Sequence, residues 1–299
     1  MPVKRLLLIK HGALGDLIQA TGVMKDVRNQ HADAEISLLT SERYLSLMGA
    51  CPFIDHIIID NRDSIMHLLA FWKLGKLLTG SQFDLVIDLQ NSDRTRFYHY
   101  WWFSKTQWIG RQHKELKPIS GLDGLINLLN QHGIATTFAR QPDLKWLIGD
   151  TESLLQQLNI KTPYVAIIPG SSAKHPEKRW PFYAQFAQLL LNDGLEVVAI
   201  LGPDENDLID TLPCKILQGL DWLALATVLK GALYVIGNDT GPSHIASHVG
   251  AKGVAVFGPT TSAKRAEITH DDFYSIQLPD LHAFNAPQLY DWLGQHFLA

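Results

Sequence analysis

Residues 234–244 read Tyr-Val-Ile-Gly-Asn-Asp-Thr-Gly-Pro-Ser-His, and they indicate both a fold and a site. The aromatic and β-branched residues at the start predict a short buried strand, which the Gly-Asn-Asp triplet ends. A helix that begins at Thr240 or Gly241 accommodates Pro242 in its first turn, where a missing N–H costs nothing. Such a turn leaves amides unpaired and carries a partial positive charge, which makes it a candidate phosphate site. An ordinary strand-to-helix turn is the alternative interpretation.

The length and composition indicate a soluble protein of two domains. The chain has 299 residues and a net charge of −4, so no general affinity for nucleic acid is expected. Cys51 and Cys214 cannot form a disulfide framework, and we expect both to be reduced in the cytoplasm. The first apolar run, Leu6–Ile9, is too short for a signal peptide or a membrane span. Peripheral contact with a membrane stays open.

Strand and helix patterns alternate along the chain, which predicts an α/β protein with parallel sheets. The expected strands are Leu6–Ile9, Ile36–Leu39, Ile57–Ile59, Leu85–Leu89, Val165–Ile168, Glu196–Leu201, a strand near Ile216, Tyr234–Ile236 and Gly253–Phe257. The expected helices are Asp16–Gln30, Ser64–Leu78, Thr151–Leu158, Pro181–Asn192, Leu220–Leu229 and Pro287–Leu298. A change of composition over residues 141–163 predicts one domain over residues 1–150, a second over 151–285, and a terminal helix over 286–299.

The loop Gly12–Asp16 joins the first strand to the first helix. Ligands of open α/β sheets bind at the carboxyl ends of strands, so this loop is well placed for a site. The loop lacks the third glycine of the dinucleotide fingerprint and the Gly-Lys-Ser/Thr of a Walker phosphate loop. Asp16 is a candidate general base, and a helix N-cap is the alternative role for this side chain.

A second loop, Pro169–Ser172, follows a strand and offers the hydroxyls of Ser171 and Ser172. Lys178 follows among other basic residues, so the region is typical of a loop that binds phosphate, although a solvated basic loop would look the same. Glu205 follows the strand Glu196–Leu201 and is placed to accept hydrogen bonds from ribose hydroxyls. Its alternative role is that of an acidic residue at the start of a helix.

The sequence gives little support to a bound metal. His244 and His248 have the i, i+4 spacing that faces both toward one side of a helix, but the glutamate of the zinc motif is absent. The chain also has no Asp-x-Asp motif, which argues against a metal-clamped sugar nucleotide. We therefore expect no metal and no cofactor.

Residues 94–117 mix basic and aromatic side chains. The basic ones are Arg94, Arg96, His99, Arg111, Lys114 and Lys117, and the aromatic ones are Tyr98, Tyr100, Trp101, Trp102 and Trp108. This mixture suits a carbohydrate with anionic groups, and it suits a membrane surface equally well. Some of these aromatic side chains must belong to the core instead.

Six short motifs occur in a fixed order: Gly12–Asp16, Asp84–Asp88, Ile109–Arg111, Lys178–Pro181, Asp239–His244 and Phe257–Thr260. In this order they resemble glycosyltransferase family 9, the ADP-heptose:lipopolysaccharide heptosyltransferases, over nearly the whole chain. The resemblance implies a GT-B fold, in which two Rossmann-like domains with parallel sheets face a central cleft. It places the acceptor on the first domain and the donor on the second, and the terminal helix commonly crosses back to the first. The residues after Thr260 lack the Asp-Pro pair that often follows in this family.

The resemblance also implies roles for individual residues. Asp16 matches the proposed catalytic base, and Lys178 matches the lysine that holds the donor phosphates. Phosphate binding falls to Ser171, Ser172, Asp239, Thr240, Gly241 and His244. Glu205 and Leu220 match the ribose and adenine contacts, and acceptor binding is assigned to Gly15, Arg94, Arg96 and Arg111.

The expected activity is inverting, metal-independent transfer of a heptose or related sugar from an ADP-sugar. The expected acceptor is an anionic glycolipid such as the lipopolysaccharide core. We expect a cytoplasmic monomer that contacts the inner membrane peripherally. A sugar-nucleotide epimerase of GT-B shape and a non-catalytic nucleotide-binding protein are the alternatives, and a dehydrogenase is disfavoured by the missing glycine.

Overall fold

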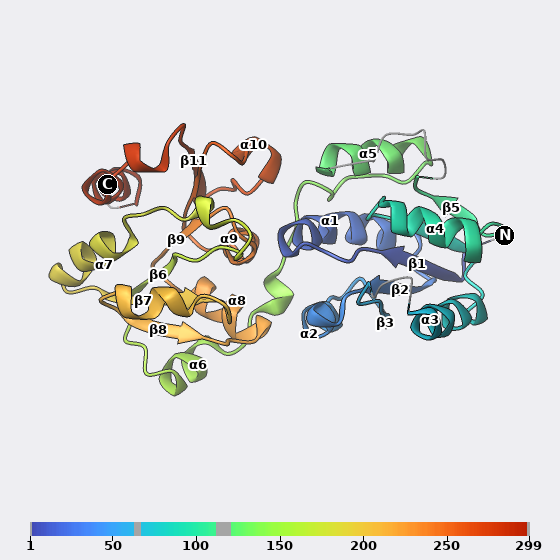
Figure 1. Cartoon of the computed structure of the whole chain (residues 1–299), viewed down its shortest axis with the longest axis horizontal. Coiled ribbons are helices and arrows are strands. Elements are labelled where there is room, and N and C mark those ends of the chain that lie inside the picture. The colour runs from blue at the N-terminus through green and yellow to red at the C-terminus, as the bar shows by residue number, and fades with distance from the viewer. Residues whose placement is uncertain (1, 63–66, 112–120, 298–299) are drawn as a thin grey trace. The chain divides into compact units, whose positions relative to one another are not determined.

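The computed structural model describes residues 2–62, 67–111 and 121–297. The chain divides into two units, Met1–Trp146 and Leu147–Ala299, close to the boundary that the sequence places near residue 150 (Figure 1). Each unit is a parallel sheet with helices, as the alternating patterns predict. None of the helices in the described ranges is long and apolar enough to cross a membrane.

The first unit is built on a five-stranded parallel sheet with the order β3-β2-β1-β4-β5. Its strands are β1 (Arg5–Ile9), β2 (Glu35–Thr40), β3 (His56–Ile59), β4 (Leu85–Asp88) and β5 (Gln107–Ile109). Its helices are α1 (Leu14–Gln30), α2 (Leu45–Gly49), α3 (Leu68–Gly80), α4 (Asp93–Trp102) and α5 (Gly121–Gln131). Because β1 lies between β2 and β4, the chain reverses direction across the sheet at the β1–β4 pair.

The second unit has a six-stranded parallel sheet with the order β11-β10-β9-β6-β7-β8. Its strands are β6 (Tyr164–Ile168), β7 (Glu196–Leu201), β8 (Lys215–Gln218), β9 (Tyr234–Asn238), β10 (Gly253–Phe257) and β11 (Phe273–Gln277). Its helices are α6 (Thr151–Gln157), α7 (Tyr183–Asn192), α8 (Trp222–Gly231), α9 (Gly241–His248), α10 (Ala263–Ala266) and α11 (Ala286–Phe297). The order is that of a Rossmann sheet, and its reversal lies at the β6–β9 pair.

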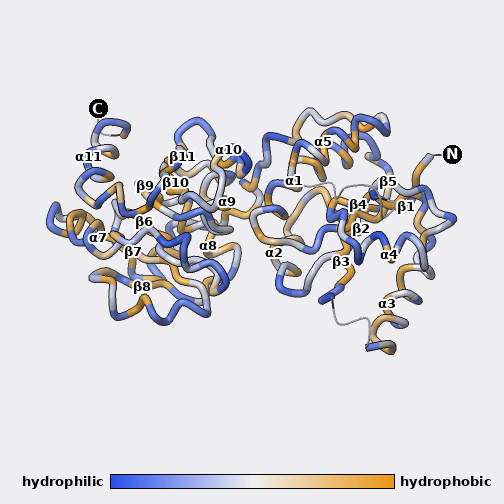
Figure 2. Tube along the Cα trace, turned by 45° about the horizontal axis from the view of Figure 1, so that its top comes forward, coloured by the Kyte–Doolittle hydropathy of each residue, from blue (hydrophilic) through white to orange (hydrophobic). Residues whose placement is uncertain are grey.

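The central strands are buried on both faces, which explains their continuous apolar sequences. Figure 2 shows apolar positions concentrated in the strands of both sheets. In the second unit one face of the sheet packs on α7 and α11, with Phe186, Leu289 and Leu293 in the core. Helix α8 contacts α6 and α9, and Figure 1 shows it on the opposite face from α7.

Local sequence sets several helix boundaries. Ser92 caps α4 and accepts a hydrogen bond from the Thr95 N–H, while the Thr95 side chain accepts one from the Ser92 N–H. Asp150 and Asp221 cap α6 and α8 in the same way, each with a carboxylate that accepts from a backbone N–H. These capped helices begin within two residues of the positions that the sequence predicts, or, for α4, where no helix was expected.

The structure differs from the expectations at a few elements. Helix α3 begins at Leu68, and the start expected at Ser64 lies outside the described residues. The sequence patterns do not anticipate the strands β5 and β11 or the helices α2, α4, α5 and α10. Helix α11 packs against α7 within the second unit, and its expected crossing to the first unit stays a prediction.

Candidate functional site

The two strands at the reversal point of the second sheet carry the expected phosphate site. Strands β6 and β9 are parallel neighbours, so the loops that follow Ile168 and Asn238 leave from the same edge of the sheet. Ligands of such sheets bind at this edge where the strand order reverses. The sequence motifs at Ser171 and at Thr240 therefore meet at one place, as their positions after strands predict.

The helix start predicted at Thr240 or Gly241 is confirmed. Thr240 is the N-cap of α9, with extended φ and ψ of −142° and 163°, and Gly241 is its first helical residue. The Ser243 hydroxyl donates to the Asn238 carbonyl at 2.7 Å, which closes the turn from strand to helix. A side chain at Gly237 would put its Cβ 2.3 Å from the Ser243 oxygen, so this turn requires glycine. The first turn of α9 offers the positive end of a helix dipole.

Lys178 lies at the same helix start. Its Nζ is 2.8 Å from Oδ2 of Asp239, and both side chains are largely buried, with 23% and 16% exposed. Asp239 directly precedes the N-cap Thr240, so the ion pair fixes the ammonium group beside the first turn of α9. The structure thus brings together Lys178, Asp239, Thr240 and Gly241, which the sequence separates by about sixty residues.

The two serines of the first loop have different surroundings. Ser171 is buried, and its hydroxyl donates to the His175 carbonyl at 2.9 Å and accepts from Arg179 Nε at 3.3 Å. Ser172 is exposed, and its hydroxyl accepts from the Lys174 N–H. The Ser171 hydroxyl therefore holds the loop to His175 and Arg179, and the phosphate contact expected of Ser171 and Ser172 stays a prediction.

Glu205 lies against the same loop. Its Oε2 accepts from the Gly202 N–H at 2.7 Å, and a Cβ at Gly170 would lie 1.9 Å from that oxygen. Burial raises the pKa of Glu205, while the Gly202 hydrogen bond and the Arg179 charge lower it. The carboxylate is thus placed beside the phosphate loop, where the sequence predicts a ribose contact. Leu220 follows β8 and is half-buried.

His244 lies in the first turn of α9, and its side chain is buried. One turn further along α9 is His248, whose Nδ1 lies 2.7 Å from Nε2 of His270, a residue that precedes β11. Burial lowers the pKa of His248 well below its usual range, and the neighbouring His270 and His244 lower it further. Within the described part of the chain, no group of three His, Cys, Asp or Glu side chains could hold a metal ion.

In the first unit, the loop that follows β1 lies at the reversal point of its own sheet. Helix α1 begins at Leu14, two residues before the expected start, with Ala13 as its N-cap. The alternative role of Asp16 as the N-cap is therefore wrong. Asp16 and Gly15 are the third and second residues of the helix, and the Asp16 side chain is exposed.

Two buried titratable side chains, Lys10 and Asp88, lie at the carboxyl ends of the neighbouring strands β1 and β4. Burial lowers the pKa of Lys10, while the nearby carboxylates of Asp16 and Asp88 raise it. Burial raises the pKa of Asp88 to about 6, in spite of hydrogen bonds from the Thr95 side chain and from the Asn91 and Gln90 N–H groups. The exposed Asp16 carboxylate thus has a buried lysine as a charged neighbour.

The three expected acceptor-binding arginines are engaged within the first unit. Arg94 lies 3.2 Å from Oδ1 of Asp60. Arg111 is buried and lies 3.1 Å from Asp93, which Arg96 also approaches at 3.7 Å. The guanidinium groups of Arg111 and Arg96 therefore converge on one carboxylate. Lys114 and Lys117 lie outside the described residues.

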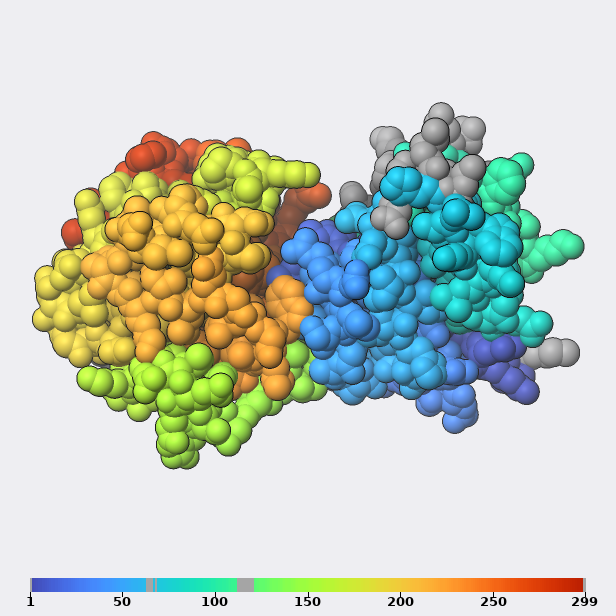
Figure 3. All heavy atoms as spheres, turned by 60° about the horizontal axis from the view of Figure 1, so that its bottom comes forward, coloured from blue at the N-terminus to red at the C-terminus, as the bar shows by residue number. Residues whose placement is uncertain are grey.

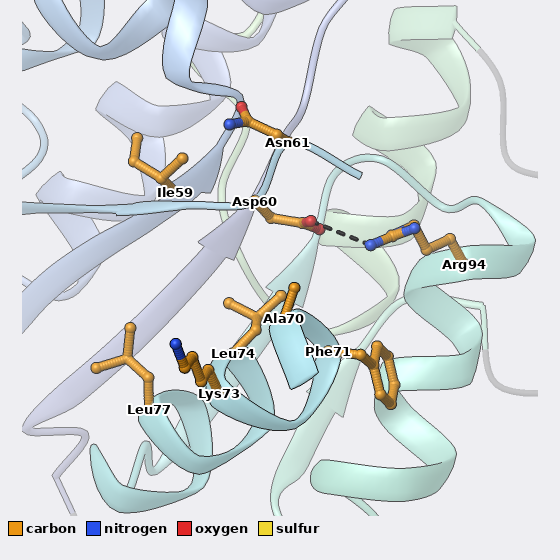
Figure 4. A pocket seen from close by; sticks show the side chains of 9 residues that line it. All are labelled: Ile59, Asp60, Asn61, Ala70, Phe71, Lys73, Leu74, Leu77 and Arg94. Atoms are coloured by element: carbon orange, nitrogen blue, oxygen red, sulfur yellow. Dashed lines mark hydrogen bonds and ion pairs between the residues drawn. The ribbon is translucent and has the colours of Figure 1, made fainter. Parts of the chain in front are cut away.

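Arg94 and Asp60 also border a hollow of about 320 Å³ in the first unit (Figure 4). The Asp60–Arg94 pair lies at one side of it, and the side chains of α3 line another. The lining residues are Ile59, Asp60, Asn61, Ala70, Phe71, Lys73, Leu74, Leu77 and Arg94.

The comparisons with known proteins decide the family. The family model described as glycosyltransferase family 9 (heptosyltransferase) matches residues 124–287, more than half of the chain. The chain belongs to glycosyltransferase family 9. Lipopolysaccharide heptosyltransferase 3 of Escherichia coli is 24% identical over 280 residues, which cover 82% of this chain and 81% of that protein.

Solved structures agree on the fold. A family 9 glycosyltransferase from Veillonella parvula matches with a TM-score of 0.80 and 18% identity, covering 100% of this chain and 99% of that one. The ADP-heptose heptosyltransferase II of E. coli matches with a TM-score of 0.78 and 19% identity, covering 98% of each chain. The fold of this family 9 glycosyltransferase is therefore GT-B, as the sequence motifs predict, and the chain is an enzyme of the transferase class.

The sequence analysis missed Asn238, the residue that joins the two loops of the candidate phosphate site in this glycosyltransferase. Asn238 is fully buried, and its Nδ2 donates toward the carbonyls of residues 168, 169 and 170 at 3.3, 2.9 and 3.0 Å. Its Oδ1 accepts from the Trp180 N–H at 3.0 Å and the Tyr183 hydroxyl at 3.1 Å. One side chain therefore holds the end of β9, the loop after β6 and the start of α7. A polar residue that ends a buried strand was the available signal.

A second missed network supports the loop that precedes Asp16. His11 Nε2 lies 2.8 Å from Oδ2 of Asp60, and the Tyr98 hydroxyl donates to the same oxygen at 2.5 Å. Burial raises the pKa of Asp60, but the hydrogen bonds from His11 and Tyr98 outweigh it and hold that pKa well below its usual range. Because His11 directly follows Lys10, this network anchors the β1 loop to the end of β3.

Proposed function

We propose that the protein transfers a heptose from an ADP-sugar to the lipopolysaccharide core, with inversion and without a metal. The observation that carries the proposal is the Lys178–Asp239 pair fixed beside the first turn of α9, at the reversal point of the second sheet. An ammonium group and a helix N-terminus at one place suit a pyrophosphate. The names of the family 9 relatives, which are lipopolysaccharide heptosyltransferases, support heptose and the core acceptor.

In the proposed reaction, Asp16 accepts the proton of an acceptor hydroxyl as its oxygen attacks the anomeric carbon. The bond from that carbon to the phosphate oxygen breaks as the new glycosidic bond forms, so a single displacement inverts the configuration. ADP leaves with the electron pair of the broken bond. Lys178 and the amides of the first turn of α9 stabilise the charge that develops on its phosphate.

The two units divide the binding work in this proposal. The second unit binds the donor, with its phosphates at Lys178, Thr240 and Gly241 and its ribose at Glu205. The first unit binds the anionic acceptor beside Asp16. We further propose that the enzyme works as a cytoplasmic monomer that contacts the inner membrane peripherally, because the acceptor is a glycolipid.

The test is a transfer assay with the purified chain, ADP-heptose and a heptose-free core acceptor, run with and without EDTA. We expect equal transfer in both conditions, and a product whose new anomeric configuration is opposite to that of the donor by NMR. Retained configuration, or a rate abolished by EDTA and restored by a metal, would refute the mechanism. Conversion of a UDP-sugar without acceptor would favour an epimerase, and binding of ADP without turnover would favour a non-catalytic protein.

A further inference from the structure

Exposed apolar side chains gather on two helices of the first unit. The described residues leave eight large hydrophobic side chains exposed, and five of these lie on α3 and α4. These five are Leu69, Trp72, Leu77, Tyr100 and Trp101, exposed by 53–77%, and they include every aromatic side chain among the eight. Scattered single apolar residues are ordinary on a surface, but a gathering of this kind indicates a binding surface.

Helix α3 combines these apolar residues with positive charge. Lys73 and Lys76 are exposed on the same helix, and the Lys76 ammonium lies 5.3 Å from the centre of the Trp72 ring. The helix has no acidic residue over its thirteen positions. Figure 3 shows α3, in cyan, at the surface of the first unit. Its outward side is therefore both apolar and cationic, while the protein as a whole carries a net charge of −4.

Helix α4 continues the surface, and aromatic rings join it to α3. The Phe71 ring of α3 lies 5.6 Å from Phe97 and 4.5 Å from Trp102 of α4. Phe97 in turn lies 5.6 Å from the exposed Trp101, which lies 5.9 Å from Tyr100. These partly buried rings pack the two helices together, and the exposed rings of Tyr100 and Trp101 continue from them. We call the five exposed apolar residues with Lys73 and Lys76 the α3–α4 surface.

We infer that the α3–α4 surface docks on a bilayer that contains anionic phospholipid. Exposed Trp, Tyr and Leu side chains on a helix with lysines and no acids have the composition of helices that lie in the membrane interface. The two lysines supply the attraction to anionic headgroups that an acidic protein otherwise lacks. The inference deepens the proposed function, because a glycolipid acceptor requires the enzyme to work at such a bilayer.

Charge also favours a bilayer over a second copy of the chain as the binding partner of the α3–α4 surface. A symmetric dimer through the α3–α4 surface would bring the same surface of each copy together, and with it Lys73 and Lys76 of both. Neither α3 nor the exposed end of α4 at Tyr100 and Trp101 offers an acidic side chain to pair with these lysines. An anionic lipid headgroup supplies the missing negative charge.

The test is cosedimentation with vesicles of phosphatidylglycerol and phosphatidylcholine, compared with vesicles of phosphatidylcholine alone. We expect the double change Trp72→Ser and Trp101→Ser to weaken binding to the mixed vesicles by about tenfold or more, because buried aromatic area is lost. We expect the double change Lys73→Gln and Lys76→Gln to lower the affinity for the mixed vesicles by roughly fivefold per lysine, because each lysine contributes attraction to the anionic surface.

Matched controls change exposed residues elsewhere. Leu45→Ser and Leu223→Ser each remove an exposed apolar side chain, and Lys161→Gln removes an exposed lysine. We expect that none of these three variants changes vesicle binding. No binding by the wild type, equal loss in the controls, or a dimer that the Trp72→Ser and Trp101→Ser changes dissociate would each overturn the inference. The proposed function is tested separately by assaying the variant that carries both Trp72→Ser and Trp101→Ser with a delipidated, water-soluble acceptor. That transfer reaction needs no bilayer.

Discussion

The replacement of Asn238 by aspartate exchanges one NH₂ group for an oxygen and tests how the donor loops are held. In the wild type the amide nitrogen faces three carbonyl oxygens, from residues 168, 169 and 170. Carbonyls only accept hydrogen bonds, so this position requires a donor. A carboxylate would place a negative oxygen against all three acceptors, in a position with no solvent exposure.

The contacts of Asn238 determine how much the Asn238→Asp change should destabilise the protein. The amide carries two hydrogens, so two donated hydrogen bonds are lost, and a charge is buried with no cation among its five partners in the described structure. We expect a loss of about 3–5 kcal/mol in the free energy of unfolding at neutral pH. For a unit of this size that corresponds to roughly 6–20 °C in the melting temperature.

The stability of the Asn238→Asp variant should also depend on pH. Burial raises the folded-state pKa of the new carboxyl above its unfolded value of about 4, so the folded state binds more protons in that interval. The stability of Asn238→Asp therefore falls as the pH rises through the interval. At low pH the protonated carboxyl donates to one carbonyl and recovers part of the loss.

Thermal unfolding of wild type and variant across this pH range measures the effect, and calorimetry with ADP measures the consequence for the site. The matched control is Asn192→Asp, because Asn192 is exposed and its carboxamide oxygen accepts from Gln188. Unchanged stability of Asn238→Asp at neutral pH, or an equal loss in Asn192→Asp, would refute the reasoning.

Three further predictions concern single contacts. Lys178→Ala is expected to weaken ADP binding by about 10–100-fold, because a charge-assisted contact is lost, and unchanged affinity in calorimetry would remove Lys178 from the phosphate site. Gly170→Ala places a Cβ against the Glu205 carboxylate and should lower the free energy of unfolding by about 1–3 kcal/mol. Gly294→Ala in α11, where a Cβ would meet nothing within 4 Å, should raise it by about 0.5–1 kcal/mol. Urea unfolding of both variants checks the two signs. The pKa of Asp88 is raised from 3.8 to about 6 in the folded protein, so folding becomes less favourable as this carboxyl ionises. Between pH 4 and pH 6 the unfolding free energy of the wild type should therefore fall by about 2–3 kcal/mol relative to that of Asp88→Asn. A difference between the two proteins that does not change with pH would contradict the raised pKa.

The sequence predicts the sheets because their strands are buried on both faces and read as continuous apolar runs. It also predicts that the loops after Ile168 and Asn238 lie close together, since parallel strands bring their carboxyl ends to one edge of the sheet. The start of α9 at Gly241 follows from local chemistry alone, with glycine, proline and small polar residues in order. Short elements such as β5, with three residues, carry too little pattern to be found this way.

The pairing of charged side chains is what the sequence does not reveal. One partner of Arg94 is Asp60, thirty-four residues earlier, and the residues around Arg94 do not indicate this pairing. Asn238 joins residues 55–70 positions away, so its role depends on the tertiary fold. The aromatic residues after Arg94 divide between core and surface, with Tyr98 buried and Trp101 exposed, because only the packing of α3 on α4 decides which side each one faces.

The measurement that tests the central claim most directly is the turnover number of Asp16→Asn with saturating donor and acceptor, beside its affinity for ADP. We predict that turnover falls by about 100-fold or more, because the variant cannot accept the acceptor's proton, while ADP affinity stays at the wild-type value. Asp33→Asn, at another exposed aspartate of the first unit, should keep wild-type turnover. Wild-type turnover in Asp16→Asn would contradict the assignment of Asp16 as the base and the mechanism built on it.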